Sequence, residues 1–254
     1  EEFTTLLQSD PRRHDLWIRY LEAVTAANRL TTQQQRLVSM IQSQLGTLPR
    51  EQALSIRERL ADAYAAHGQY AQSLEILEPL VVASPADTQL RAKLAMSLVG
   101  IGRVSEALPM LVELVDRNPK ATDLRMQLAQ AYIAAKNDER ANEEFSLLIK
   151  REQDRESLDF ARLLLNAAGV SQRLQRQDES RKRFAAALDI LAVMLRDNRD
   201  NVELWQPFLD AAAGTREFSA AVGRQALYIA EHRQQHIPTK VFLTRIADVM
   251  SILD

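Results

Sequence analysis

The chain has 254 residues, 46% of them hydrophobic and 26% charged, and its 32 Lys and Arg almost balance 34 Asp and Glu. This composition excludes wholesale disorder, and the near-zero net charge gives no global attraction to nucleic acid or to an acidic membrane. The sequence contains no Cys, which excludes disulfides, thiolate metal sites and thiol nucleophiles.

The chain begins with EEFTTLLQSD, without an initiator Met or a signal peptide, so we expect it to be a fragment of a longer protein. No apolar run approaches the roughly 20 residues of a membrane span, so we expect no membrane insertion. The chain has only 7 Gly and 8 Pro, with abundant Ala, Leu and Glu. Many helices joined by short turns have this composition, and strands are not expected.

The first predicted helix contains Trp17, Tyr20, Leu21 and Val24, and 33–45 forms its partner. Three contiguous blocks of 34 residues follow, 54–87, 88–121 and 122–155. The shared positions hold Leu60, Leu94 and Leu128, then Ala61, Ala95 and Ala129, then Tyr64, Leu98 and Tyr132, and then Ser73, Ala107 and Ala141. Such a period is typical of a solenoid, in which each unit buries its apolar face against its neighbours.

Each block is predicted to be a helical hairpin. In the central block Gly102 ends the first helix, where a left-handed residue is needed. The second helix is expected to begin near Ser105, whose hydroxyl would cap it, and to end before Pro119. The small residue at Ala107 and its equivalents would let the two helices of one unit approach closely.

Less regular copies of the hairpin are expected on both sides, at about 14–47, 156–200 and 202–235, with a partial unit at 239–254. The unit at 156–200 carries about five extra residues, and we expect it to interrupt the regular stacking. Pro207 should bend or delay the start of its helix, because it removes an amide donor. Pro79 poses the same question in a second helix. Lys136 stands where the other blocks have Gly, so its turn is expected to be looser.

The spacing resembles that of the tetratricopeptide repeat (TPR) family. The positions that match in the central block are Leu94, Ala95, Leu98, Gly102, Ala107, Leu111 and Pro119, and the neighbouring blocks match at most of the same places. The resemblance implies an all-α fold, a TPR-type right-handed superhelical solenoid of helical hairpins that runs through 1–254 as a single fragment.

In this family the first helices line a concave groove that holds a protein partner. The residues that the resemblance places there are Glu58, Asp62, Gln89, Met96, Val99, Asp123, Met126, Gln130 and Ile133. The Lys and Asn clamp that some chaperone cofactors use for a C-terminal carboxylate is missing. An apolar stripe beside an acidic end instead suits an amphipathic helix or a hydrophobic edge. The alternative is that these apolar side chains pack against the adjoining helices.

Other candidate chemistry is weak in this sequence. His232 and His236 stand four residues apart on one predicted helix face, but the string between them lacks a general base and no third metal ligand is evident, so we expect no metal and no cofactor. A run of basic residues from Arg173 to Arg183 is interpreted as a solvated helix end rather than a polyanion contact. No phosphate loop, nucleophile elbow or other catalytic set is present, which predicts no enzymatic activity and no nucleic-acid partner.

Two functions remain open. The first is a non-catalytic protein-interaction scaffold, similar to the periplasmic TPR region of bacterial export proteins for exopolysaccharide, of the Pel and cellulose type, which recruits a partner enzyme. The second is a helical sensor or regulatory domain of a larger transcription regulator or enzyme. The first predicts a periplasmic location and the second permits a cytoplasmic one. Self-association is compatible with both.

Overall fold

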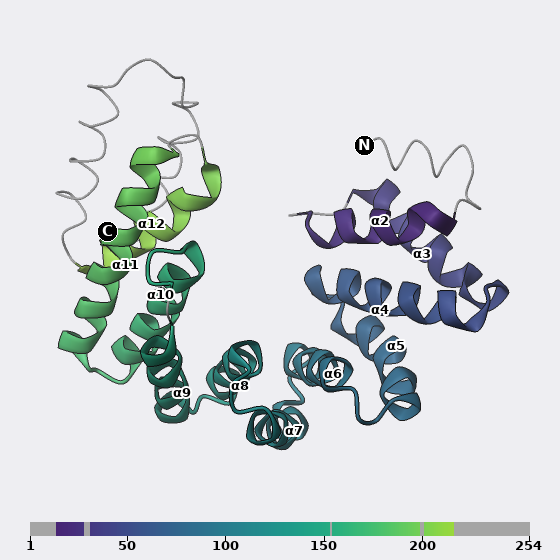
Figure 1. Cartoon of the computed structure of the whole chain (residues 1–254), viewed down its shortest axis with the longest axis horizontal. Helices are drawn as coiled ribbons and strands as arrows, with labels where there is room; N and C mark the ends of the chain where they lie inside the picture. The colour runs from purple at the N-terminus through teal and green to yellow at the C-terminus, as the bar shows by residue number, and fades with distance from the viewer. Residues whose placement is uncertain (1–13, 28–30, 153, 199–200, 216–254) are drawn as a thin grey trace, which may run out of the picture. The chain divides into compact units, whose positions relative to one another are not determined.

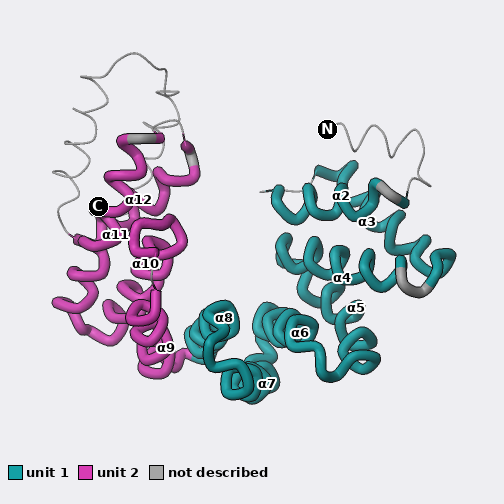
Figure 2. The backbone as a smooth tube through the Cα atoms, in the orientation of Figure 1, with its two compact units in different colours: residues 1–135 teal, residues 136–254 magenta. Residues whose placement is uncertain are grey.

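Helices joined by turns and short irregular segments make up the part of the chain that the structure describes, with no strand among these residues. The structure is a computed structural model that describes residues 14–27, 31–152, 154–198 and 201–215 (Figure 1). The chain divides into two units, unit 1 at Glu1–Ala135 and unit 2 at Lys136–Asp254 (Figure 2). The fold is an all-α solenoid of TPR type, as the sequence predicts. The predicted partial repeat at 239–254, most of 202–235 and both His232 and His236 lie outside the described residues.

Unit 1 contains three and a half helical hairpins within its described part. Its helices are α2 (His14–Thr25), α3 (Thr32–Gln44), α4 (Arg50–Ala66), α5 (Tyr70–Ala83), α6 (Thr88–Gly100), α7 (Val104–Arg117) and α8 (Thr122–Ala134), with a short 3-10 turn, η1 (Leu45–Thr47), after α3. Side chains begin two of these helices by capping free amides. The carboxylate of Asp87 accepts from the amides of Gln89 and Leu90, at 2.9 and 3.0 Å, and Thr31 forms a capping box with Gln34.

The core of unit 1 follows the 34-residue register. Leu60 and Ala61 in α4 and their equivalents in α6 and α8 are all buried, and the three Ala side chains are fully enclosed. Trp17 of α2 and Leu111 of α7 are completely buried as well. Each first helix therefore packs its repeat residues inward, as a solenoid requires.

The small residue in the second helix is buried, but at Ser73 it meets a different neighbour from the predicted one. The Ser73 hydroxyl lies 3.1 Å from the hydroxyl of Ser97 in α6, which belongs to the next hairpin. At this position the small side chain therefore permits close approach between adjacent hairpins, whereas the sequence analysis placed the contact within one hairpin.

Helix α7 begins differently from the prediction. Its first residue is Val104 and its N-cap is Arg103, which makes no side-chain capping bond, so Ser105 lies inside the helix. The Arg103 guanidinium instead pairs with Glu106 in the first turn, at 2.6 Å. The predicted end of the helix before Pro119 is confirmed, because α7 ends at Arg117.

Unit 2 contains α9 (Asp138–Arg151), α10 (Leu158–Arg173), α11 (Gln177–Asp197) and α12 (Val202–Thr215). The Ser157 hydroxyl caps α10 by accepting from the amide of Phe160 at 3.1 Å. Helix α11 packs against both α10 and α12. Pro207 lies well inside α12 and does not delay its start, so the expected late beginning is wrong. Pro79 is likewise accommodated within α5.

In the described part of the chain, four turns between helices each contain one residue with a left-handed backbone. Gly68 and Gly102 have φ angles of 72° and 84°, and Lys136 and Gln175 reach 58° and 59°. Lys136 adopts the backbone conformation of the two glycines, and the looser turn expected there stays a prediction. After Gly68, Gly102 and Gln175, the next amide bonds back to the end of the preceding first helix, for example Arg176 to the Ser171 carbonyl at 2.9 Å.

Replacing Gln175 by Gly should stabilise unit 2. A non-Gly residue with a left-handed backbone costs the folded state roughly 1–2 kcal/mol, and Gly removes this cost. Gly also gains conformational freedom in the unfolded chain, which offsets part of the benefit of the substitution. We expect a net rise of about 0.5–1 kcal/mol in the free energy of unfolding by urea titration. Gln172→Gly, one turn earlier within α10, is the matched control and should cost about 1 kcal/mol. A loss of stability in both variants would contradict the assigned turn conformation.

Candidate functional site

The nine predicted partner-contact residues all lie on first helices of unit 1, and none is fully buried. Helix α4 carries Glu58 and Asp62, α6 carries Gln89, Met96 and Val99, and α8 carries Asp123, Met126, Gln130 and Ile133. Gln89, Asp123 and Gln130 are exposed, and the other six are half-buried. We call this set the first-helix face. Its residues are accessible to differing degrees, as a partner-contact surface requires.

The three helices that carry the first-helix face form one layer in unit 1. Helices α6 and α8 contact each other directly and lie on the same side of α7 (Figure 1). Helices α4 and α6 are joined by an ion pair between the Asp62 carboxylate and the Lys93 ammonium, at 2.8 Å. Helix α2 packs against α4 at the other end of the layer. A ligand that crossed the layer would therefore meet residues from several repeats at once.

The four apolar residues of the face differ in how they are held. Met96 and Val99 on α6 are half-buried and pack against the core of unit 1. Met126 and Ile133 on α8 are also half-buried. Both interpretations from the sequence therefore apply in part, because Met96 and Val99 support the core while part of each side chain remains accessible. An apolar stripe of this kind offers a partner about 25 cal/mol for each Å² of apolar surface that it covers.

The Asp62 carboxylate is less accessible to a ligand than the sequence predicts. It forms an ion pair with Lys93, a residue without a predicted role, and both side chains are about a quarter to a third exposed. Lys93 comes three residues before Met96, so the two lie about one helical turn apart on the same side of α6. This spacing was the sequence signal for a cation beside the first-helix face. The pair neutralises Asp62, and a cationic ligand group would have to displace Lys93 to reach it.

Two carboxylates of the first-helix face remain open to a ligand. Among the described residues, Glu58 on α4 and Asp123 on α8 form no ion pair, in contrast to Asp62. They lie on the two outer helices of the three, with the apolar residues of α6 between them in sequence. The face therefore combines apolar residues on α6 and α8 with open carboxylates on its two outer helices, α4 and α8.

The basic run in unit 2 is only in part the solvated helix end that the sequence predicted, because some of its cations are paired. The Arg173 guanidinium binds the Asp138 carboxylate through three hydrogen bonds of 2.6 to 3.0 Å, and this partner lowers the pKa of Asp138. Arg176 binds Glu139 at 2.7 Å and approaches Glu179 at 4.0 Å. Arg173 and Arg176 are thus matched by carboxylates of α9 and α11, whereas Arg181 and Lys182 of the same run are exposed.

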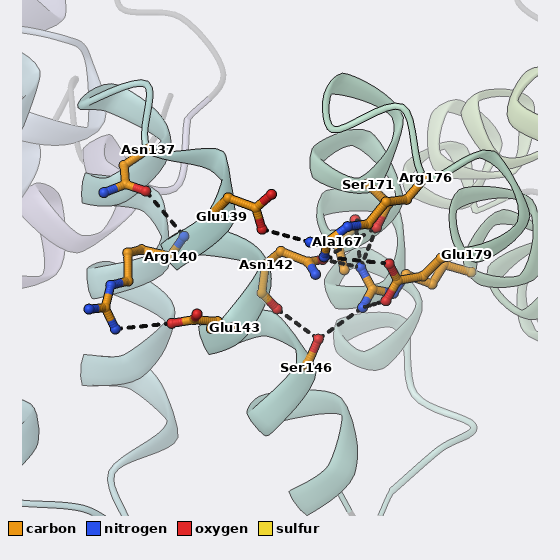
Figure 3. Close-up of polar contacts among 11 residues, drawn as sticks. Asn137, Glu139, Arg140, Asn142, Glu143, Ser146, Ala167, Ser171, Arg176 and Glu179 are labelled. Carbon is orange, nitrogen blue, oxygen red and sulfur yellow. Dashed lines mark hydrogen bonds and ion pairs between the residues drawn. The ribbon is translucent and has the colours of Figure 1, made fainter.

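Arg183 is buried, and sequence reasoning missed its role. Its side chain is only 10% exposed, and burial lowers its pKa. The guanidinium donates to five acceptors on three helices, several of which are labelled in Figure 3. These acceptors are the Asn142 Oδ1 at 2.6 Å, the Ala167 carbonyl at 2.9 Å, the Ser171 Oγ at 2.6 Å, the Ser146 Oγ at 3.0 Å and the Glu179 Oε1 at 2.8 Å. We call these six residues the Arg183 cluster.

The Arg183 cluster connects all three helices of the first joint in unit 2. Asn142 comes from α9, Ser171 from α10, and Arg183 itself from α11. The Ser171 hydroxyl also lies 3.3 Å from the Asn142 Oδ1. A buried guanidinium is costly unless its donors are satisfied, and here the acceptors satisfy it. The cluster is filled by its own side chains, and its geometry is that of a structural contact.

Other chemistry receives little support from the geometry. No group of three or more His, Cys, Asp or Glu side chains in the described part of the chain is arranged to hold a metal. His67 meets a backbone acceptor, since its Nε2 lies 2.7 Å from the Val24 carbonyl across the α2 and α4 helix ends. Among the helices that the structure describes, none combines the length and apolar character needed to cross a membrane.

Comparisons with known proteins agree with the repeat assignment. Residues 98–167 match the sequence profile of the tetratricopeptide repeat. No curated protein matches the chain in sequence. Among solved structures, a protein of nearly identical TPR-like repeats from Podosopora anserina is 23% identical, covers 76% of this chain and 98% of its own, and has a TM-score of 0.55. A thermophilic TPR protein from Thermus thermophilus is 17% identical, covers 78% of this chain and 98% of its own, and has a TM-score of 0.57.

Proposed function

Because residues 98–167 carry tetratricopeptide repeats, we propose that the chain is a protein-interaction scaffold whose partner binds the first-helix face of unit 1. The observation that carries this proposal is the layer of α4, α6 and α8, in which half-buried Met126 and Ile133 accompany the unpaired carboxylates Glu58 and Asp123. A protein segment with apolar side chains and nearby cations fits such a face. The chain then acts by binding, and we expect no catalytic step.

Introducing negative charge into the apolar stripe tests this proposal. Met126→Glu, alone and combined with Met96→Glu, places a carboxylate where the partner would bury apolar surface. We expect the affinity for the partner to fall at least tenfold, about 1.4 kcal/mol. Capture from a native extract identifies the partner with the unmodified chain, and titration with the purified partner then measures each variant.

Val82→Glu is the matched control, because Val82 lies on the second helix α5 with 81% of its surface exposed. This variant should bind the partner like the unmodified chain. Circular dichroism melts separate the outcomes. A double variant that unfolds would show that Met96 and Met126 are needed for the core, and one that stays folded and binds unchanged would exclude the first-helix face.

The finer proposal is that this scaffold belongs to bacterial exopolysaccharide export and works in the periplasm. Its support is the absence of Cys and the divergent, Ala- and Arg-rich repeats, which are similar to those of such export proteins. Osmotic-shock fractionation of the source cells, followed by detection with an antibody to this chain, tests the location. Release together with a periplasmic marker enzyme is expected, and retention with a cytoplasmic marker would favour a regulatory domain instead.

A further inference from the structure

The Arg183 cluster occupies positions that are apolar in the regular part of the solenoid. Lys136 and Gln175 are equivalent turn residues, because both have left-handed φ angles after a first helix, and they stand 39 residues apart. The earlier blocks follow the 34-residue register. Counted from these turn residues, the positions equivalent to Asn142, Ser171 and Arg183 at the joint of α5, α6 and α7 are occupied by Leu74, Leu98 and Met110. Leu74 and Leu98 are core residues, and Met110 packs against the core.

Three apolar side chains at one joint are thus replaced by three hydrogen-bonded polar ones at another. The replacement is concerted, since the Arg183 guanidinium bonds both Asn142 and Ser171 at 2.6 Å. An apolar set would gain free energy from burial, whereas a buried charge costs free energy before its partners offset it. Stability alone therefore does not explain the polar set.

Selective stacking does explain it. Hairpins of a repeat protein have similar stacking surfaces, and misassembly between them is a characteristic failure of such chains. The buried guanidinium of the α10–α11 hairpin finds all its hydrogen-bond acceptors only when the hairpin packs on a helix that has an acceptor at the position of Asn142. If it stacked on α5, the guanidinium would face Leu74 and lose an acceptor in an apolar setting.

We propose that the Arg183 cluster is a stacking code, which makes α9 the only helix among those that the structure describes to accept the α10–α11 hairpin. A buried polar residue that fixes pairing at some expense of stability is the best-attested use of such groups. Glu179 lies on α11 beside Arg183, so it completes the guanidinium shell without selecting the partner helix. Ser171 also belongs to the α10–α11 hairpin, so the side chains that identify α9 are Asn142, at 2.6 Å from the guanidinium, and Ser146, at 3.0 Å.

A crosslinking reporter in the full chain tests the code. Asp138 and Arg173 meet across α9 and α10 outside the cluster, and the chain has no Cys of its own. Asp138→Cys with Arg173→Cys therefore gives two thiols that a short bis-maleimide joins within one chain when α10 stacks on α9. The chain is refolded from urea before crosslinking, so that each hairpin can stack on any helix that accepts it. Gel mobility then separates intramolecular from intermolecular products.

In this reporter, Asn142→Leu with Arg183→Met copies the apolar pair of the α5–α7 joint. We expect the doubly substituted chain to remain helical, while its intramolecular crosslink yield falls at least threefold and intermolecular products rise. Unchanged yield would overturn the proposal. Leu164→Ala is the matched control, because this buried α10 residue lies outside the cluster. It should weaken the hairpin without lowering the intramolecular yield.

Hydrogen exchange of α10 and α11 in the chain without the reporter distinguishes a code from a simple stabiliser. Asn142→Leu alone leaves the buried guanidinium short of an acceptor, so protection should fall at least tenfold. Adding Arg183→Met should restore protection to within about threefold of the original, because the apolar pair suits a buried joint. If the double variant is less protected than Asn142→Leu, the cluster is a stabiliser and the proposed code is wrong.

Discussion

Replacing Trp17 by Ala should lower the free energy of unfolding by about 3–5 kcal/mol, the largest effect expected from one substitution in this chain. Trp17 is completely buried in α2, and the His14 ring stands edge-on to it at a centroid distance of 4.5 Å. Its removal leaves a cavity that α2 and its neighbours fill only in part. Urea titration followed by circular dichroism measures the change.

Trp205 then remains as the single tryptophan and reports on unit 2 through its fluorescence. Since the energy of a solenoid is local, the loss should appear first in the helical signal of unit 1. Val82→Ala is the control at an exposed position and should change stability by less than about 0.5 kcal/mol. A loss below about 1 kcal/mol for Trp17→Ala would mean that α2 does not pack as described.

Enlarging Ala107 to Leu should cost about 1–3 kcal/mol through overpacking. Ala107 is fully enclosed in α7 and occupies the small-residue position that Ser73 and Ala141 share. Three added carbon atoms have no space there, so either α7 or its neighbours must shift. The midpoint of urea unfolding should fall while the slope stays constant.

Ala71→Leu serves as the control for Ala107→Leu, because Ala71 is exposed on α5 and Leu is nearly as good a helix former as Ala. Its expected effect is within about 0.5 kcal/mol. An unchanged midpoint for Ala107→Leu would show that the small residue has no packing role.

The regular hairpins could be predicted from the sequence because each apolar position recurs in the register. The predicted first helix of the central block lies within α6, and its predicted end at Gly102 agrees with the left-handed turn there. The start of α7 could not be predicted from a hydroxyl residue alone, because helices also begin without a side-chain cap. The left-handed backbone at Lys136 could not be predicted from residue type, because a non-Gly residue seldom has a positive φ angle.

The Arg183 cluster escaped the sequence analysis for a different reason. Arg is mostly exposed in proteins, and carboxylates stand among the neighbouring cations in sequence, which favours a solvated interpretation. The available signal was the alignment of Arg183 with Met110, together with that of Asn142 with Leu108. One polar residue at an apolar repeat position does not by itself indicate a buried pair. The two residues indicate one only when both alignments are considered together. The sequence predicted which helices carry the first-helix face. It could not predict the ion pair between Lys93 and Asp62, because that pair depends on how α4 and α6 pack.

Site-specific photo-crosslinking in the source cells tests the central claim most directly, that a protein partner binds the first-helix face. A photoreactive amino acid at Gln89 or Gln130, both exposed on that face, should form an adduct with the same partner protein. The same group at Val82 or Ala71, on the second helix α5, should form none. Adducts from the α5 positions alone would contradict the account, because the partner would then bind the second helices.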